Sequence, residues 1–167
     1  MHNVEKFYLK IAELVAEIDS NYSSAKRRCV DYIVDAPERV DIVAKTSPNE
    51  IAVEKSKSAQ DFSDEYCEFV CLYRSIAEKL PFFDGFVFHG AAVEVNGKAY
   101  VFTAPSGTGK STHIKLWMDA LGEKVRVING DKPILRKKDG GFIVTLRRGR
   151  GKRTGTAIFP RRSTRSV

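Results

Sequence analysis

A short glycine-rich run in the second half of the chain constrains its fold more than any other feature. The run is Ala104-Pro105-Ser106-Gly107-Thr108-Gly109-Lys110-Ser111. The segment before it, Lys98–Thr103, has the composition of a strand, and the segment after it, Ser111–Leu121, has the apolar spacing of a helix. A further apolar segment, Val125–Ile128, has the composition of a buried strand. The order strand, loop, helix, strand predicts a parallel βαβ unit.

The run matches the phosphate-binding pattern G-x-x-x-x-G-K-[ST] except at its first position, where Ala104 replaces glycine. Gly107 and Gly109 can adopt positive φ angles and lack a Cβ, so consecutive amides can turn toward one anion. The N-terminus of the following helix adds amide donors and partial positive charge. In such loops the lysine reaches the outer phosphates and the serine hydroxyl ligates Mg²⁺, which assigns these roles to Lys110 and Ser111. The run therefore predicts a site for ATP with magnesium.

The expected nucleotide contacts extend over the run and one residue beyond it. They are Ala104, Pro105, Ser106, Gly107, Thr108, Gly109, Lys110, Ser111 and Thr112. Asp131 ends the next strand, where an acid either holds magnesium beside Ser111 or caps a turn. His89, taken alone, is a histidine at a strand end, where structural roles are commoner. The pattern does not separate ATP from GTP.

The charge of the chain divides between its body and its C-terminal segment. The 167 residues carry a net charge of +7. Residues 145–167 contain seven Arg, one Lys and no acid, whereas residues 1–144 contain 20 basic and 21 acidic side chains. A nearly neutral body does not favour a nucleic-acid-binding protein, and non-specific binding to nucleic acid is expected only of the basic segment.

The sequence also predicts a compartment. No run approaches the ~18 consecutive apolar residues of a membrane-spanning helix, and the N-terminal residues lack the pattern of a secretory signal. Cys29, Cys67 and Cys71 are an odd number of cysteines without a C-x-x-C pair, as in reduced cytosolic proteins. We therefore expect a cytoplasmic protein without a membrane partner.

Residues 1–80 are predicted to form a β-rich region that ends in a helix. Short apolar segments between turn-forming residues predict strands at Cys29–Val34, Val40–Ala44 and Ile51–Val53. The segment Phe7–Ile18 fits both a helical face and the alternation of a strand.

The helix of this region is expected between Ser63, which can cap its N-terminus, and Pro81, which stops it. Its apolar stripe is expected to face the core. The stripe consists of Tyr66, Phe69, Val70, Tyr73, Ile76, Ala77 and Leu80.

Residues 81–144 are predicted to form a core that contains the glycine-rich loop. Asn96-Gly97 predicts a tight hairpin turn just before the loop, and a second hairpin is expected to end at Phe142–Val144. Gly122 is placed to end the helix that follows the loop. That helix can turn four apolar side chains toward a sheet: Ile114, Leu116, Trp117 and Leu121.

Three segments resemble those of a known protein family: Phe88–Val93, Tyr100–His113 and Val127–Pro133. They resemble the catalytic domain of HPr kinase/phosphorylase, and more closely the uncharacterised HPr-kinase-like proteins. The resemblance implies an α/β fold with a P-loop nucleotide-binding core, shared with ATP-type phosphoenolpyruvate carboxykinase. It also implies phosphoryl transfer from Mg-ATP to a hydroxyl acceptor, either a protein serine or a small molecule. The resembled kinase assembles into rings, so a homo-oligomer is among the implied partners.

The resemblance implies roles for individual residues. In the family a histidine-glycine pair lies near the transferred phosphate, and His89-Gly90 matches it. Two adjacent aspartates follow the next strand, one on the metal and one acting as base toward the acceptor hydroxyl. This chain has Gly130-Asp131 there, so metal binding fits better than proton abstraction, and a non-catalytic nucleotide-binding module is the alternative. The implied catalytic residues are Asp131, His89 and Lys110, and the implied magnesium ligands are Ser111 and Asp131.

The C-terminal segment departs from the resembled proteins, which continue with Thr-Pro-Trp-x-Gly-Lys and an Asn-rich stretch ending in Pro-Leu. Read one base earlier, the codons of Thr145–Lys152 are compatible with Tyr-x-Thr-Pro-Trp-Ser-Gly-Lys. Those of Thr156–Ser163 are compatible with Asn-Ser-Asn-Ile-Ser-Ala-Pro-Leu. Residues 145–167 are expected to be a disordered tail, and we hypothesise that a frameshift near Val144 makes them non-native. The competing interpretation is a native basic arm, and the nucleotide sequence of the gene distinguishes the two.

Overall fold

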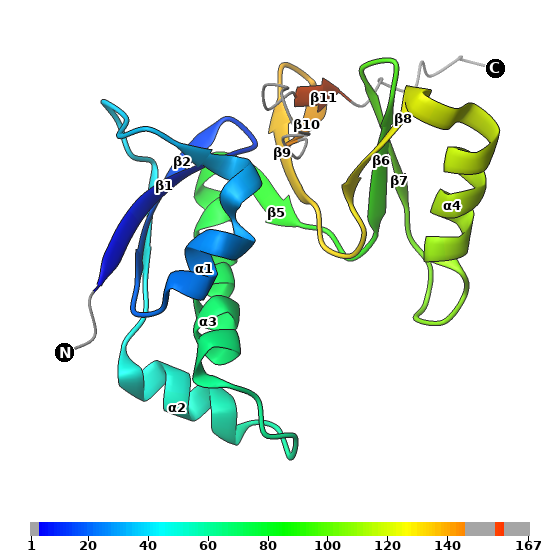
Figure 1. The fold of residues 1–167 in the computed structure, drawn as a ribbon. Coiled ribbons are helices and arrows are strands. Elements are labelled where there is room, and N and C mark those ends of the chain that lie inside the picture. The colour runs from blue at the N-terminus through cyan, green and yellow to red at the C-terminus, as the bar shows by residue number, and fades with distance from the viewer. Residues whose placement is uncertain (1–3, 146–155, 159–167) are drawn as a thin grey trace. The chain divides into compact units, whose positions relative to one another are not determined.

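The computed structural model describes residues 4–145 and 156–158 (Figure 1). The chain divides into two compact units, Met1–Phe82 and Phe83–Val167. Both units combine strands with helices, so the fold is mixed α/β. Among the described residues, no helix is both long enough and apolar enough to cross a lipid bilayer.

The first unit contains a four-stranded sheet in the order β3-β1-β2-β4. Its strands are β1 (Glu5–Ile11), β2 (Leu14–Ser20), β3 (Ile33–Val34) and β4 (Ile42–Lys45). β1 pairs antiparallel with β2 and with β3, whereas β4 runs parallel to β2. The strand predicted at Val40–Ala44 is therefore present as β4.

The ambiguous segment Phe7–Ile18 forms the β1–β2 hairpin rather than one helix or one strand. Its turn is made by Ala12 and Glu13, which both have positive φ angles, 49° and 62°. Turns of this kind usually contain Gly, Asn or Asp. Because neither residue is of that type, the sequence carries no mark of the turn.

The strand predicted at Cys29–Val34 is shorter than expected. Helix α1 (Ser23–Arg28) and the 3₁₀ turn η1 (Val30–Tyr32) occupy the chain up to β3. Within this segment, only Ile33–Val34 forms a strand, and it pairs with Tyr8 and Leu9 of β1.

The segment Ile51–Val53, predicted as a strand, lies inside helix α2 (Pro48–Ser56). That prediction is wrong because a capping box begins a helix just before it. The Ser47 hydroxyl accepts a hydrogen bond from the Glu50 amide at 3.3 Å, and the Glu50 carboxylate accepts one from the Ser47 amide at 2.7 Å. Pro48 at the first helical position also favours the helix.

Helix α3 (Asp64–Lys79) is capped as expected, since the Ser63 hydroxyl accepts a hydrogen bond from the Tyr66 amide at 3.3 Å. The predicted stripe is only partly its buried side, because Ile76 and Leu80 are buried but the aromatic residues are not. Tyr66 is exposed and stacks on Phe62, whereas a carboxylate, Glu68, is fully buried. The buried residues of α3 are Cys67, Glu68, Leu72 and Ile76, and Leu80 in the following turn η2 (Leu80–Phe83) is also buried. A hydrophobic stripe could not predict a buried side that includes a charged residue.

The second unit contains a seven-stranded sheet in the order β5-β9-β10-β11-β7-β6-β8. Its strands are β5 (Gly85–Val87), β6 (Ala91–Val95), β7 (Lys98–Phe102), β8 (Val125–Asn129), β9 (Ile134–Lys138), β10 (Gly141–Thr145) and β11 (Thr156–Ile158). The predicted Asn96-Gly97 turn joins β6 to β7, with φ angles of 51° and 77°. The second predicted hairpin is β9–β10.

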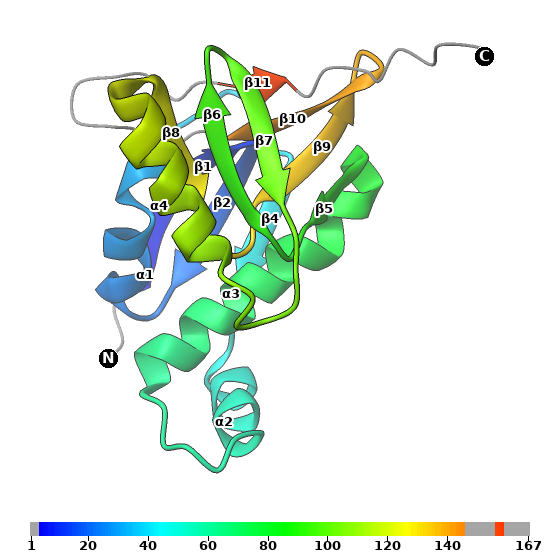
Figure 2. The ribbon, with the colours of Figure 1, turned by 90° about the vertical axis from the view of Figure 1, so that its right-hand side faces the viewer.

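The chain passes from β7 through helix α4 (Lys110–Leu121) and the turn η3 (Gly122–Lys124) to β8 (Figure 2). β7 and β8 are each antiparallel to β6, which lies between them, so they run in the same direction. The predicted parallel crossover is thus present, with one antiparallel strand inserted. Gly122, with φ 58°, ends α4 as expected.

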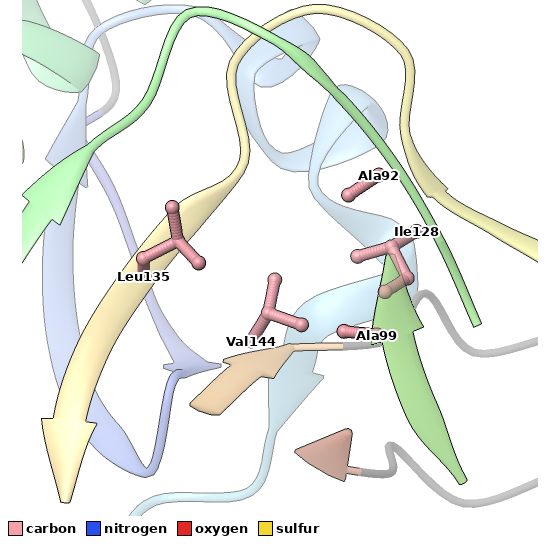
Figure 3. Packing of buried hydrophobic residues seen from close by; sticks show 5 residues of the cluster. All are labelled: Ala92, Ala99, Ile128, Leu135 and Val144. Carbon is pink, nitrogen blue, oxygen red and sulfur yellow. The ribbon is translucent and has the colours of Figure 1, made fainter. Parts of the chain in front are cut away.

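Two hydrophobic clusters form on the two faces of this sheet, because neighbouring residues of β6 point to opposite sides. Ile114 of α4 packs on Ala91, Val93 and Val125. The cluster drawn in Figure 3 contains Ala92, Ala99, Ile128, Leu135 and Val144.

The prediction for the buried side of α4 is partly wrong. Ile114 is buried and Trp117 is half-buried, but Leu116 is 58% exposed and Leu121 is 40% exposed. Leu116 lies two residues after Ile114 and therefore about 200° around the helix from it.

The predicted tail, residues 145–167, lies mostly outside the described residues. Thr145 ends β10, and Thr156–Ile158 forms β11, which pairs antiparallel with β10 and parallel with β7. These three residues form a strand, whereas disorder was expected over the whole of 145–167. The frameshift near Val144 stays a prediction.

Candidate functional site

The glycine-rich run forms the loop between β7 and α4, and two of its glycines have backbone angles that other residues rarely adopt. Gly107 has φ 83° and Gly109 has φ 93°. A Cβ on Gly107 would meet no atom within 4 Å, so this glycine serves the backbone angle rather than close packing. Gly109 is the N-cap residue of α4. Left-handed residues of this kind turn consecutive amides toward one point, as in known anion-binding loops.

The carbonyl oxygen of Pro105 is the centre of the loop's hydrogen bonds. It accepts hydrogen bonds from the Thr108 hydroxyl at 2.7 Å, the Thr108 amide at 3.4 Å and the Lys110 ammonium at 3.3 Å. The same ammonium donates to the Ala104 carbonyl at 2.7 Å. Lys110 therefore reaches from the first turn of α4 back to the start of its own loop.

The loop also has amide groups that are free to bind a ligand. Across the described residues, the amides of Gly107 and Gly109 donate no hydrogen bond to the protein, and no side chain caps the N-terminus of α4. The positive end of the helix dipole lies at the same place. Together with the Lys110 ammonium, these donors suit an anionic ligand that has several oxygen acceptors.

His89 and Asp131 contact each other at the end of the sheet that carries the loop. Their Nε2 and Oδ1 atoms lie 3.5 Å apart, and the side chains are 65% and 68% exposed. The His89 carbonyl accepts a hydrogen bond from the hydroxyl of Thr103, the residue just before the loop, at 3.3 Å. The Asp131 carbonyl accepts one from the Gly90 amide at 2.8 Å. These contacts thus link the segments that contain His89, Thr103 and Asp131 beside the loop.

Gly90 allows this close approach. A Cβ at position 90 would lie 2.7 Å from the Phe102 carbonyl oxygen and 2.8 Å from the Phe88 ring. Both distances are shorter than real Cβ contacts, and the first involves backbone, which cannot turn away as a flexible side chain can. The glycine that follows His89 therefore has a packing reason, which its sequence context did not indicate.

The backbone before Asp131 is held by Asn129, for which no role was predicted. The Asn129 Oδ1 atom accepts hydrogen bonds from the amides of Asp131 and Lys132, both at 2.9 Å. Asparagine at the start of a turn commonly binds amides two residues on, so Asn-Gly-Asp at a strand end could have predicted this bond.

Ser111 is exposed on the first turn of α4. Within the described part of the chain, no hydrogen bond or ion pair joins Ser111 to Asp131, and no group of three or more His, Cys, Asp or Glu side chains is placed to hold a metal ion. Magnesium bound with a nucleotide takes most of its ligands from phosphate oxygens and water. The Ser111 hydroxyl and the Asp131 carboxylate are oxygen donors of the type that magnesium then takes from a protein.

An aromatic cluster packs beside the loop, on β7 and α4. The Trp117 Nε1 atom donates a hydrogen bond to His113 Nε2 at 3.2 Å. The Phe102 ring contacts both, with centroids 4.6 Å from His113 and 5.3 Å from Trp117. Because Trp117 is the only tryptophan of the chain, its fluorescence reports on the helix that follows the loop.

The structure thus brings the loop, His89 and Asp131 to one end of the sheet, but among the described residues no hydrogen bond or ion pair links Ser111 to Asp131. No protein-family model and no curated protein matches this chain.

Proposed function

We propose that this chain binds a magnesium-bound nucleoside triphosphate such as ATP at the loop Ala104–Ser111. The observation that carries the proposal is the pair of left-handed glycines, Gly107 and Gly109, beside the Lys110 ammonium at a strand-to-helix junction. A polyanion accepts hydrogen bonds from the amides and from the ammonium at once. A neutral ligand would leave the ammonium bound to the Ala104 and Pro105 carbonyls.

Each group of the loop has a role in this proposal. The Lys110 ammonium moves from the Ala104 and Pro105 carbonyls to the outer phosphates. Within the loop backbone from Ser106 to Gly109, the amides that do not donate to Pro105 bind the β-phosphate. Magnesium, when bound, neutralises phosphate charge. The Ser111 hydroxyl and the Asp131 carboxylate are the oxygen donors that this chain would offer to it.

We further propose a kinase-like activity toward a hydroxyl acceptor, either a protein serine or a small molecule. The acceptor oxygen bonds to the γ-phosphorus as the bond to the bridging oxygen of ADP breaks, and the hydroxyl proton passes to Asp131 or to water. The exposure of His89 and Asp131 beside the loop supports this proposal, as does the resemblance to HPr-kinase-like proteins.

A nucleotide-binding module without catalysis is the second candidate. It is favoured by Gly130, which stands where the resembled kinases have one of two aspartates. Phosphoryl transfer depends mainly on positioning and charge neutralisation, so one missing carboxylate slows the reaction without excluding it.

Calorimetric titration with Mg-ATP tests the binding proposal. The wild type is compared with Lys110→Ala and with Lys115→Ala, which removes an exposed lysine from the same helix. We expect Lys110→Ala to weaken binding by about tenfold or more, and Lys115→Ala by less than about twofold. Equal affinities of the wild type and Lys110→Ala, or no binding by either, would overturn the proposal.

ADP release then separates the two candidates. It is measured with water alone and with free serine or glycerol as hydroxyl acceptors, in the wild type and in Asp131→Asn. Acceptor-dependent release that Asp131→Asn reduces supports the kinase. Nucleotide binding without release supports the non-catalytic module.

A further inference from the structure

We propose that the side-chain hydroxyl of Thr108 is a positioning group: it holds the turn Pro105–Thr108 in its phosphate-binding shape once Lys110 has moved to the ligand. This inference rests on the proposed nucleotide binding and adds a side chain whose role lies within the loop itself. The Thr108 hydroxyl does not contact phosphate in this proposal, because it donates to the Pro105 carbonyl.

The turn is closed by two bonds from one residue. The Thr108 amide donates to the Pro105 carbonyl across four residues, but at 3.4 Å this bond is long. The Thr108 hydroxyl donates to the same oxygen at 2.7 Å, the usual length for such a bond. Gly107, at the third position of the turn, supplies the positive φ of 83°. The hydroxyl therefore makes the better of the two bonds that define the turn.

Side-chain packing does not hold the turn. All four residues from Pro105 to Thr108 are exposed, and the space where a Gly107 Cβ would lie is open. A segment without buried contacts keeps its shape through hydrogen bonds, and each one lost lets the backbone sample other conformations. The bonds to the Pro105 carbonyl therefore determine where the loop amides point.

Ligand binding makes the hydroxyl more important. In the structure two side chains bind the Pro105 carbonyl, those of Thr108 and Lys110. When the Lys110 ammonium pairs with phosphate, only the side chain of Thr108 remains on that oxygen. Loss of the hydroxyl thus weakens the bound state more than the free state, and it appears as reduced affinity rather than reduced stability.

Two substitutions at position 108 separate the hydroxyl from the shape of the side chain. Thr108→Val replaces the hydroxyl by a methyl group, and Thr108→Ser keeps the hydroxyl. Both variants and the wild type are titrated with Mg-ATP and with magnesium tripolyphosphate, which lacks base and ribose, by calorimetry and by Trp117 fluorescence. We expect Thr108→Val to weaken both ligands by the same factor, about five- to tenfold, and Thr108→Ser to restore affinity to within about twofold. The thermal midpoint of the ligand-free protein should change by less than about 2 °C.

The outcomes distinguish this inference from the function on which it rests. If the wild type binds and Thr108→Val binds equally well, or if Thr108→Ser is as weak as Thr108→Val, the positioning role is wrong while nucleotide binding stands. A loss for Mg-ATP alone, with tripolyphosphate unchanged, also overturns it, because the effect would then concern the nucleoside. If the wild type binds neither ligand, the proposed function and the positioning role both fail.

Discussion

The two units use their carboxylates differently. In the first unit, Glu68 is fully buried and accepts hydrogen bonds from the Asn21 amide, the Asn21 side chain and the Tyr22 amide at 2.6, 2.9 and 3.1 Å. In the second unit, Asp131 is 68% exposed, and its carboxylate lies 3.5 Å from an equally open His89. A buried carboxylate that accepts several hydrogen bonds from the protein stabilises a fold. A solvent-exposed carboxylate beside a loop with free amides is available to a ligand.

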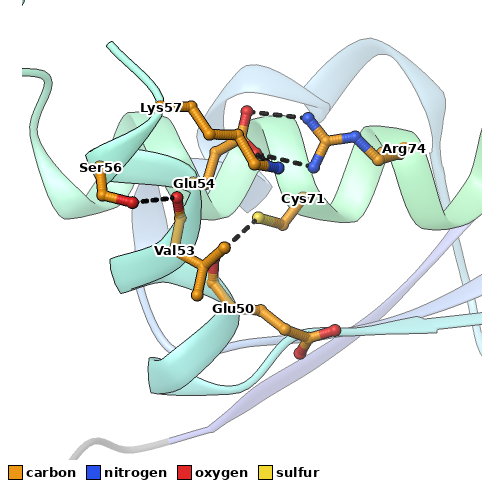
Figure 4. Close-up of polar contacts among 7 residues, drawn as sticks. All are labelled: Glu50, Val53, Glu54, Ser56, Lys57, Cys71 and Arg74. Atoms are coloured by element: carbon orange, nitrogen blue, oxygen red, sulfur yellow. Dashed lines mark hydrogen bonds and ion pairs between the residues drawn. The ribbon is translucent and has the colours of Figure 1, made fainter. Parts of the chain in front are cut away.

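A second carboxylate of the first unit, that of Glu54, also accepts several hydrogen bonds from the protein. Arg74 donates to both oxygens of Glu54 at 2.8 Å, and Lys57 donates to one of them at 2.7 Å (Figure 4). The bond from Arg74, with that from Lys57, lowers the pKa of Glu54 to about 2. The Arg74 bonds join α2 to α3, so they serve the packing of the two helices.

Glu94 shows that the second unit also has a structural carboxylate, but at the other end of its sheet. It is 3% exposed and accepts bonds from the Arg126 side chain and from the Gly97 amide in the β6–β7 turn. Burial alone would raise the pKa of Glu94, but these two donors lower it below its ordinary value. The loop follows β7 at the opposite end from this turn, so structural and available carboxylates are separated along the strands.

The units also differ in net charge. Residues 1–82 contain 11 Lys and Arg against 15 Asp and Glu, whereas residues 83–145 contain nine against six. The unit that carries the glycine-rich loop is therefore basic even without the C-terminal segment. A positive unit favours the approach of a polyphosphate, and the acidic unit does not.

The largest effect is expected from Glu68→Ala. The substitution removes the acceptor of three hydrogen bonds from the turn between β2 and α1, and it should lower the free energy of unfolding by about 3 kcal/mol. Urea unfolding followed by circular dichroism measures the loss. The control, Glu65→Ala, changes an exposed carboxylate of the same helix and should cost less than about 0.5 kcal/mol. Equal effects of the two substitutions would remove the contrast between the units.

Gly90→Ala should have the next largest effect. The added Cβ overlaps the Phe102 carbonyl and the Phe88 ring, so the free energy of unfolding should fall by about 2 kcal/mol. The Mg-ATP affinity should fall with it, because the segments that carry His89 and Thr103 separate. Gly130→Ala is the matched control for stability, since its Cβ would meet no atom within 4 Å. A stable Gly90→Ala variant with unchanged affinity would show that this contact does not shape the site.

Glu54→Gln should have a smaller effect that depends on pH. The pKa of Glu54 is about 2 in the folded chain and ordinarily 4.5, so its ionised form stabilises folding above about pH 5. That contribution is lost as the pH falls from about 5 to 2. The variant should therefore be less stable than the wild type by about 1 kcal/mol at pH 7, and the difference should vanish only below about pH 2. A difference that stays constant with pH would contradict the assigned ion pair.

The second unit could be predicted further than the first because its turns contain residues suited to positive φ. Asn96-Gly97 and Gly122 mark the ends of elements, and the structure confirms both. In the first unit, the Ala12-Glu13 turn has positive φ angles without such a residue. The buried side of α3 includes Glu68, which no hydrophobic pattern can reveal.

The candidate site also has parts that the sequence predicts and parts that it does not. The loop and its lysine follow from a local pattern of eight residues, because their geometry depends on neighbours in the chain. The contact between His89 and Asp131 depends instead on β6 lying between β7 and β8, and a single sequence does not give strand order. The Thr108 and Asn129 bonds are local, and turn chemistry could have predicted them.

Asn129→Ala should have the smallest effect on stability and the one that best sharpens the comparison. It removes the oxygen that binds the Asp131 and Lys132 amides at an open strand end, where water can replace it, so the loss should be about 0.5 kcal/mol. Asn129→Asp keeps the acceptor oxygen and should be as stable as the wild type. The Mg-ATP affinity of Asn129→Ala should nevertheless fall by about two- to threefold, because Asp131 loses its fixed position. We therefore expect the Asn129 hydrogen bonds to contribute more to nucleotide binding than to folding. If Asn129→Ala instead lowered the free energy of unfolding as much as Glu68→Ala, polar groups would stabilise the fold in both units alike.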